Sequence, residues 1–126
     1  MNNRNVLFID DDEDDHEIFL SAVKVMERQV NCTLSYDATE ALAKLLSKEI
    51  VPDVIFLDLN MPVMSGQQFL VEIKKNAALK DIPVIIFSTS SHFNTIQQMK
   101  ELGAQQFITK PDKYEDLVNI LKPILS

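Results

Sequence analysis

The sequence has a single cysteine, a shortage of positive charge and no long hydrophobic run. Cys32 is the only cysteine, which excludes an intramolecular disulfide framework and a cysteine-rich metal site. There are 12 lysines and arginines against 19 aspartates and glutamates, so the net charge is −7. This balance argues against direct binding to nucleic acid or to an anionic membrane. No apolar stretch approaches the roughly 20 residues that a membrane-spanning helix needs.

These absences favour a protein of the reducing cytoplasm. The N-terminal Met1-Asn2-Asn3-Arg4 is not followed by the long apolar run of a secretory signal. At 126 residues, the chain has the length of one domain with a sizeable core. Cys32 falls in a predicted strand, where we expect it to be a small buried residue.

What the sequence does contain is a regular alternation of short apolar runs and amphipathic segments. The predicted strands cover residues 5–10, 32–36, 53–58, 83–88 and 105–109. The predicted helices cover residues 14–27, 38–48, 65–76, 91–102 and 112–125. Such an alternation predicts an α/β fold with a doubly wound parallel sheet and helices on both faces. Two strand orders are common in such folds, and periodicity alone leaves both open.

Three predicted helix starts have the spacing of a capping box. The pairs are Asp37 with Glu40, Ser65 with Gln68, and Asp112 with Glu115. In the predicted fourth helix, four apolar residues at helical spacing are expected to face the core: Phe93, Ile96, Met99 and Leu102.

An acidic run of six residues follows the first predicted strand. We expect Asp12 and Asp14 to cap the first helix and favour its positive end. Glu13 and Asp15 are expected to be solvated. The two histidines, His16 and His92, are far apart in sequence, and we expect neither to bind metal or carry a phosphoryl group.

Four of the apolar runs lead into polar residues that can take part in chemistry. In chain order these are 6–9 with Asp10 and Asp11, 54–57 with Asp58, 84–87 with Ser88, and 107–109 with Lys110. The ligand site of an open parallel sheet lies at the carboxyl ends of its strands. We therefore expect three carboxylates, a hydroxyl and an amine to meet at one edge of the sheet.

Three neighbouring carboxylates need compensation. Two of them about 5 Å apart repel by about 3 kcal/mol at an effective dielectric of about 20, and Lys110 alone cannot offset three such pairs. Mg²⁺ suits a site of few carboxylates completed by water and phosphate, and the backbone carbonyl of Asn60 is a further candidate ligand. An aspartate oxygen beside the ion can attack phosphorus, while Ser88 and Lys110 contact the phosphoryl oxygens.

With these motifs the chain resembles a receiver domain of a two-component response regulator, of the stand-alone type related to the chemotaxis response regulator. The matching segments are Phe8-Ile9-Asp10-Asp11-Asp12, Leu57-Asp58-Leu59-Asn60-Met61-Pro62 with Gly66, residues 83–89, Gly103-Ala104, Phe107 and Lys110-Pro111. The resemblance covers nearly the whole chain. It implies a flavodoxin-like sheet of strand order 2-1-3-4-5 and a single receiver domain over residues 1–126, with no output domain.

The resemblance also implies roles for the acidic residues. Asp58 corresponds to the phospho-acceptor of the family. Asp11, Asp58 and the backbone carbonyl of Asn60 correspond to direct ligands of Mg²⁺, and Asp10 corresponds to a residue that binds the ion through water.

Three other positions match the family's phosphate contact and its switch. Lys110 corresponds to the phosphate-contacting lysine, and the family typically has a cis peptide bond at the position of Lys110-Pro111. Ser88 occupies the position of the switch hydroxyl. Phe107 occupies that of the rotameric aromatic residue, where the family often has tyrosine.

The implied partners are two proteins. The resemblance implies that a sensor histidine kinase supplies a phosphohistidine and that the domain itself catalyses transfer of the phosphoryl group to Asp58. Because the domain catalyses only its own phosphorylation and dephosphorylation, we do not expect it to be an enzyme. Phosphorylation then changes the surface of the fourth helix, fifth strand and fifth helix, for which Lys100, Phe107 and Tyr114 are candidate contacts. We expect one of three results: binding of an unknown downstream protein, a change of dimer state, or onward transfer of the phosphoryl group.

Two other functions fit the sequence less well. A small Mg²⁺-dependent phosphatase of the haloacid dehalogenase type would use Asp10 as its nucleophile, in Asp10-Asp11-Asp12. That class needs a late acidic pair at a strand end, where this chain has Lys110 and Pro111. A constitutive binding module would keep the fold without phosphorylation, but we expect such a module to have lost some of the site residues.

Overall fold

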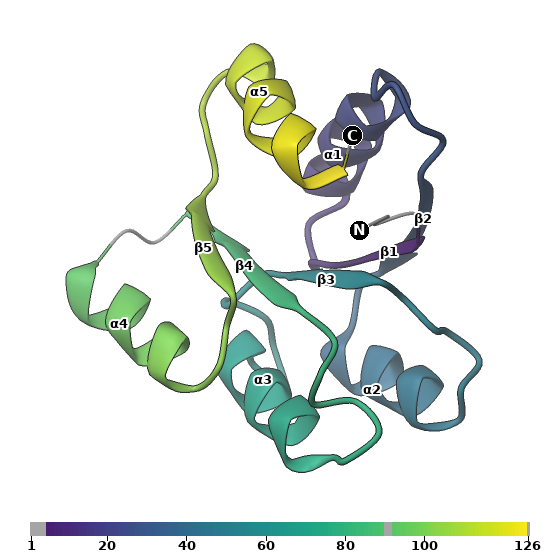
Figure 1. The fold of residues 1–126 in the computed structure, drawn as a ribbon. Coiled ribbons are helices and arrows are strands. Elements are labelled where there is room, and N and C mark those ends of the chain that lie inside the picture. The colour runs from purple at the N-terminus through teal and green to yellow at the C-terminus, as the bar shows by residue number, and fades with distance from the viewer. Residues whose placement is uncertain (1–4, 90–91, 126) are drawn as a thin grey trace.

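A computed structural model describes residues 5–89 and 92–125, in which five strands and five helices alternate along the chain (Figure 1). The strands are β1 (Asn5–Ile9), β2 (Asn31–Ser35), β3 (Val54–Leu57), β4 (Val84–Ser88) and β5 (Gln106–Thr109). The helices are α1 (Glu13–Lys24), α2 (Ala38–Leu46), α3 (Gly66–Lys75), α4 (Phe93–Glu101) and α5 (Tyr114–Leu125). The predicted alternation is confirmed. None of the helices in this part of the chain is long and apolar enough to cross a membrane.

All four strand pairs are parallel, and the order across the sheet is β2-β1-β3-β4-β5. This confirms the doubly wound α/β fold and the strand order 2-1-3-4-5. Ile9 of β1 lies beside Leu57 of β3, and Ser88 of β4 lies beside Thr109 of β5. The residues that follow these strands are therefore brought to the same edge of the sheet.

The helices cover both faces of the sheet (Figure 1), α1 and α5 on one side and α2, α3 and α4 on the other. A hydrophobic core lies on each face of the sheet, and alternate residues of a strand pack into one core or the other. Phe8 and Phe56 belong to the core that includes Phe19 of α1, whereas Leu57 belongs to the core that includes Phe69 of α3. Because both faces of β1, β3 and β4 are covered, these strands are almost entirely apolar and show no period-two alternation.

Several helix starts follow the predicted capping pattern. The Asp12 carboxylate accepts from the backbone N–H of Asp14 at 2.9 Å, and Ser65 and Gln68 form a complete capping box. Asp37 also caps its helix, because its carboxylate accepts from the backbone N–H of Thr39 at 2.7 Å.

The expected cap at Asp112 is wrong. Helix α5 begins at Tyr114, and the first helical N–H groups, those of Asp116 and Leu117, donate to the carbonyl of Lys113. Pro111 and Asp112 lie in the loop that carries the chain from edge strand β5 to the face covered by α1, so they are not available to start the helix.

The prediction of a buried Phe93 is also wrong. Met99 of α4 is buried as expected, but the Phe93 side chain, at the first position of the helix, is 72% exposed. Helix α4 packs mainly against β5, which is an edge strand, so only a narrow stripe of the helix reaches the core. Cys32 is only half-buried for the same reason, because β2 is the other edge strand.

Candidate functional site

Three carboxylates meet at the carboxyl ends of the two central strands β1 and β3. Asp10 and Asp11 follow β1, and Asp58 follows β3. The Asp58 backbone N–H donates to the carbonyl of Ile9 at 3.0 Å, which continues the ladder between the two strands. Each aspartate offers a carboxylate oxygen, and these oxygens all lie within 4.8 Å of one another. Asp10 and Asp58 are buried and Asp11 is exposed, so the cluster is open to solvent at Asp11.

Lys110 follows the edge strand β5 and reaches this cluster along the same edge of the sheet. Its backbone N–H donates to the carbonyl of Ser88 at 2.8 Å, which holds the start of the β5–α5 loop beside the end of β4. Its ammonium donates to Oδ2 of Asp10 at 2.9 Å and to Oδ2 of Asp15 at 2.7 Å. The same nitrogen lies 3.6 Å from Oδ1 of Asp58. One ammonium is thus shared among three carboxylates.

The Lys110–Pro111 peptide bond is trans, since no cis bond occurs in residues 5–89 and 92–125, and the expected cis bond is wrong. Trans is the ordinary state even before proline. The backbone bond to Ser88 and the two carboxylate acceptors are enough to direct the Lys110 side chain into the cluster.

The charges of the cluster shift the pKa values of its members. Burial raises the pKa of Asp58 to about 6, since the attraction of Lys110 offsets only part of the desolvation and Asp10 adds repulsion. Burial also raises the pKa of Asp10, against the opposing hydrogen bond from Lys110. Burial by itself would lower the pKa of Lys110, but the hydrogen bonds to Asp10 and Asp15 and the charge of Asp58 raise it above its usual value. At neutral pH the site therefore carries excess negative charge around a protonated lysine.

This donor set fits a small, hard divalent cation. Carboxylate oxygens are the ligands that Mg²⁺ prefers, and an exposed carboxylate such as Asp11 leaves a side open for water and a phosphoryl group. Asn60, the other expected ligand, lies exposed in the β3–α3 loop, two residues after Asp58. The use of its backbone carbonyl stays a prediction.

The two expected switch residues lie on the neighbouring strands. Ser88 ends β4 and is fully buried. Phe107 of β5 is half-buried and packs against the core beneath α3 and α4. In the sheet register Phe107 lies beside Ile86, two residues before Ser88 on the same strand.

Asp15 was expected in solvent, and that expectation is wrong. Its side chain is only 26% exposed, and it forms the shortest of the three ion pairs of Lys110. A signal in the sequence points the same way. Asp15 precedes the buried Phe19 and Ala22 by four and seven residues, which places it on the core-facing stripe of α1.

His16 also lies closer to the site than the sequence suggests. The residue is 1% exposed, and its Nε2–H donates to the backbone carbonyl of Asp10, which can only accept. The ring stacks on Tyr36 with centroids 4.0 Å apart and meets Phe8 edge-on. His16 therefore acts as a packed support beneath Asp10.

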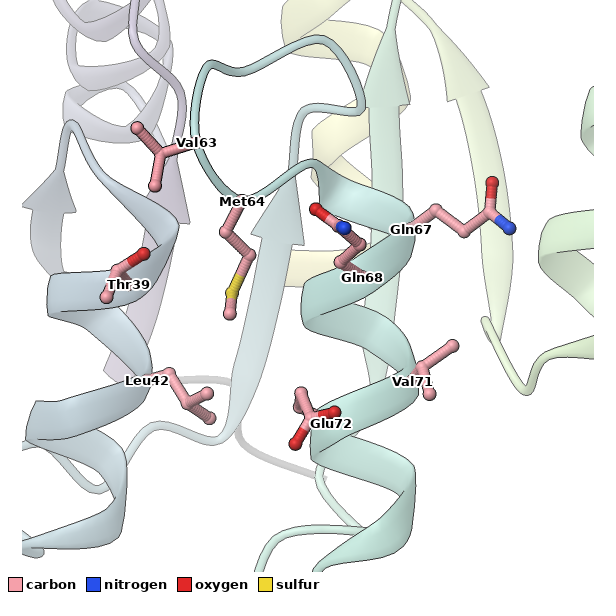
Figure 2. A pocket seen from close by; sticks show the side chains of 8 residues that line it. All are labelled: Thr39, Leu42, Val63, Met64, Gln67, Gln68, Val71 and Glu72. Carbon is pink, nitrogen blue, oxygen red and sulfur yellow. The ribbon is translucent and has the colours of Figure 1, made fainter.

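A separate groove of about 420 Å³ lies between α2 and α3. Figure 2 shows Met64 projecting from the β3–α3 loop into the space between the two helices, with Leu42 and Glu72 below it. Among the described residues that line the groove, Glu72 is the only charged one. The carboxylate cluster at the sheet edge, and not this groove, is the candidate functional site.

The fold and the acidic edge define a signalling domain of a known class. A family model for the response regulator receiver domain matches residues 6–122, and the chain belongs to that family. Receiver domains of two-component systems are signalling switches and not conventional enzymes. The haloacid dehalogenase alternative is therefore not favoured.

Individual relatives agree with this assignment. Protein PilG of Pseudomonas aeruginosa is 31% identical over 111 residues, which cover 86% of this chain and 81% of PilG. The crystal structure of the phosphorylated cyanobacterial phytochrome response regulator RcpA has a TM-score of 0.88 and 30% identity, covering 97% of this chain and 91% of that one. The Mn²⁺-bound form of response regulator Rcp1 has a TM-score of 0.86 and 28% identity, covering 96% and 91%.

Proposed function

We propose that this receiver domain is switched by transfer of a phosphoryl group from a sensor histidine kinase to Asp58. The observation that carries the proposal is the position of Asp58, buried at the end of a central strand, with carboxylate oxygens of Asp10 and Asp11 within 4.8 Å and the ammonium of Lys110 3.6 Å away. A buried carboxylate surrounded in this way has a nucleophilic oxygen and a cation close to where the transferred charge would lie.

The proposed step is a transfer between two protein side chains. A carboxylate oxygen of Asp58 bonds to phosphorus, the bond from phosphorus to the histidine nitrogen breaks, and the imidazole leaves with its electron pair. Asp58 must be ionised to attack, and a pKa of about 6 leaves it ionised at pH 7. Lys110 moves toward one of the new phosphoryl oxygens while it stays bonded to Asp10, and Ser88 donates to another of these oxygens.

We propose Mg²⁺ as the metal, held directly by Asp11, Asp58 and the Asn60 carbonyl. When bound, this ion would neutralise part of the charge on the phosphoryl oxygens. Asp10 fits an indirect role, because both of its oxygens already have protein donors. Oδ1 accepts from the backbone N–H of Asp12 at 2.9 Å, and Oδ2 accepts from Lys110. The Mn²⁺ reported for Rcp1 supports a divalent ion at such a site.

The proposed output surface is formed by α4, β5 and α5. Withdrawal of the Ser88 hydroxyl toward the phosphoryl group would leave space for the half-buried Phe107 ring to move inward. Lys100 is exposed on α4, and the Tyr114 hydroxyl donates to the carbonyl of Ser21, which ties α5 to α1. The exposed Phe93 ring adds an apolar contact at the start of α4. A downstream protein, or a second copy of the chain, would bind to this surface. We propose that this protein and its partners are located in the cytoplasm.

The decisive experiment is intact-protein mass spectrometry after incubation with acetyl phosphate and Mg²⁺. We expect one added phosphoryl group, lost in Asp58→Asn and in the presence of a metal chelator. Asp14→Asn removes a nearby exposed carboxylate of α1 and should still be phosphorylated. Binding of beryllofluoride without added mass would indicate rapid hydrolysis, whereas failure of both would favour the constitutive binding module.

A further inference from the structure

We propose that Asp15 is a positioning residue of the phosphoryl site, which holds Lys110 back from Asp58 until a phosphoryl group competes for it. This inference rests on the proposed function and adds a fourth carboxylate to its site. Asp15 lies in the first turn of α1, 95 residues before Lys110 in sequence, so that the ion pair joins α1 to the β5–α5 loop.

The three distances from the ammonium of Lys110 carry the argument. The bonds to Asp15 and Asp10 are 2.7 and 2.9 Å long, whereas Asp58 at 3.6 Å lies beyond ordinary hydrogen-bond distance. An ammonium has three protons to donate, and two of them are directed at Asp15 and Asp10. Lys110 is therefore bound on the α1 side of the site and only attracted toward Asp58.

Burial decides which of the two bonds gives way. The Asp10 side chain is fully buried, so removal of its lysine would leave a desolvated carboxylate without its cation, which is costly. The Asp15 side chain is 26% exposed and can be hydrated after it releases Lys110. Asp15 is thus the partner that Lys110 can leave.

The charge of a phosphoryl group competes with Asp15 for the ammonium of Lys110. A protein phosphate carries about two negative charges at neutral pH and offers several acceptor oxygens. Formation of a bond from Lys110 to the phosphoryl oxygens would break the bond to Asp15, and the charge of Asp15 also opposes the incoming anion. Both effects mean that Asp15 weakens binding of the phosphoryl group.

The test is a titration of beryllofluoride, the stable mimic of the phosphoryl group, at saturating Mg²⁺. We expect Asp15→Asn to bind it about fivefold more tightly than the wild type, the effect of one partly exposed ion pair. Asp14→Asn is the matched control, since it removes the same charge from the adjacent residue of α1, and it should change the affinity by less than about twofold. Unchanged or weaker binding in Asp15→Asn would overturn the proposal.

A second comparison asks whether Asp15 acts through Lys110. In a Lys110→Ala background, Asp15→Asn should increase the affinity for beryllofluoride by much less than it does in the wild type, since only the direct repulsion by the Asp15 charge remains. An increase of the same size in both backgrounds would show that Asp15 acts only as a distant charge, and would also overturn the proposal.

The ammonium itself can be followed by nitrogen-detected NMR of lysine side chains. We expect the Lys110 Nζ signal of the wild type to shift on addition of beryllofluoride and the signal of unliganded Asp15→Asn to differ from that of unliganded wild type. If Asp15→Asn folds poorly, the measurement on the wild type is sufficient by itself. A Lys110 signal that did not shift on addition of beryllofluoride would contradict the exchange of partners. Failure of the wild type to bind beryllofluoride would instead contradict the proposed function.

Discussion

Gly66 lies directly against the backbone of Asp58: a Cβ placed on Gly66 would stand 2.2 Å from the Asp58 carbonyl oxygen and 2.8 Å from the Cα of Leu59. The Gly66 N–H also donates to the carbonyl of Leu59 at 3.0 Å. The first turn of α3 is therefore bound to the segment that carries the proposed phospho-acceptor, and the backbone there has no room for a side chain.

Gly66→Ala should disturb both stability and the site. The added methyl group meets backbone atoms that cannot rotate away, so we expect a loss of about 1 to 3 kcal/mol in the free energy of unfolding and a weaker affinity for Mg²⁺. Urea denaturation and calorimetric titration of Mg²⁺ measure the two effects. Gly103→Ala is the control, because Gly103 has a φ of 107° and its Cβ would meet only the flexible side chain of Lys74. It should lower stability but leave the Mg²⁺ affinity unchanged.

Asp58→Asn should make the metal-free protein more stable at neutral pH. The Asp58 pKa is raised to about 6 in the folded state from 3.8, so the folded protein binds this proton more tightly than the unfolded chain. Its contribution is fully present below about pH 4 and is lost as the pH rises through about 6. We expect Asp58→Asn to exceed the wild type by about 1 to 3 kcal/mol at pH 7.5, with a smaller difference at pH 4. Urea denaturation in the presence of a chelator at both pH values measures this difference.

Saturating Mg²⁺ provides the control for this comparison. It should stabilise the wild type more than Asp58→Asn, because the variant has lost a carboxylate of the cluster. A wild type that is more stable than the variant without metal at pH 7.5 would mean that Lys110 fully offsets the desolvation of Asp58.

Val63→Gly should increase stability. Val63 has a φ of 67°, a left-handed conformation that β-branched residues avoid, and its side chain is 92% exposed, so little burial is lost with it. We expect a gain of about 0.5 to 1 kcal/mol, the relief of the left-handed strain less the added freedom of glycine in the unfolded chain. Val51 is an exposed valine whose φ is not positive, and Val51→Gly should be slightly destabilising. Equal effects of the two substitutions in urea denaturation would contradict this explanation.

The Cys32 thiol should react slowly despite its position on an edge strand. Burial raises its pKa to about 12, so very little thiolate is present at pH 8. We expect alkylation by iodoacetamide at least about 100-fold slower in the folded protein than in urea. The folded protein also holds this proton more tightly than the unfolded chain, so stability should fall as the pH rises from about 9 toward 12, and Cys32→Ala should remove this part of the decline. A thiol that reacts equally fast in both states would show that β2 opens readily.

The secondary structure could be predicted from the sequence because its signals are local. The apolar runs before Asp10, Asp58 and Ser88 are long enough for strands and carry no period-two alternation, which is typical of strands covered on both faces. The boundaries of strands agree with the structure to within one residue at each end. The helix ends agree less well: α1 ends at Lys24, not at residue 27, because helix ends depend on packing as much as on pattern.

The structure changed the interpretation of residues whose neighbours come from distant parts of the chain. Phe93 has the spacing of a core residue, yet α4 covers only the edge of the sheet and leaves the ring in solvent. His16 looks like one more polar residue in an acidic segment, yet Phe8 and Tyr36 enclose it from two different strand ends.

The sequence by itself determined the α/β fold and the meeting of Asp10, Asp58, Ser88 and Lys110 at one sheet edge. It could do so because strand periodicity and the parallel crossover rule place every strand end on the same side. Only the tertiary structure decided which carboxylates the ammonium of Lys110 contacts. Asp15 becomes its nearest partner because α1 packs beside α5 and brings its first turn to the β5–α5 loop. A contact between residues 95 positions apart depends on where two helices dock, and no local pattern contains that information.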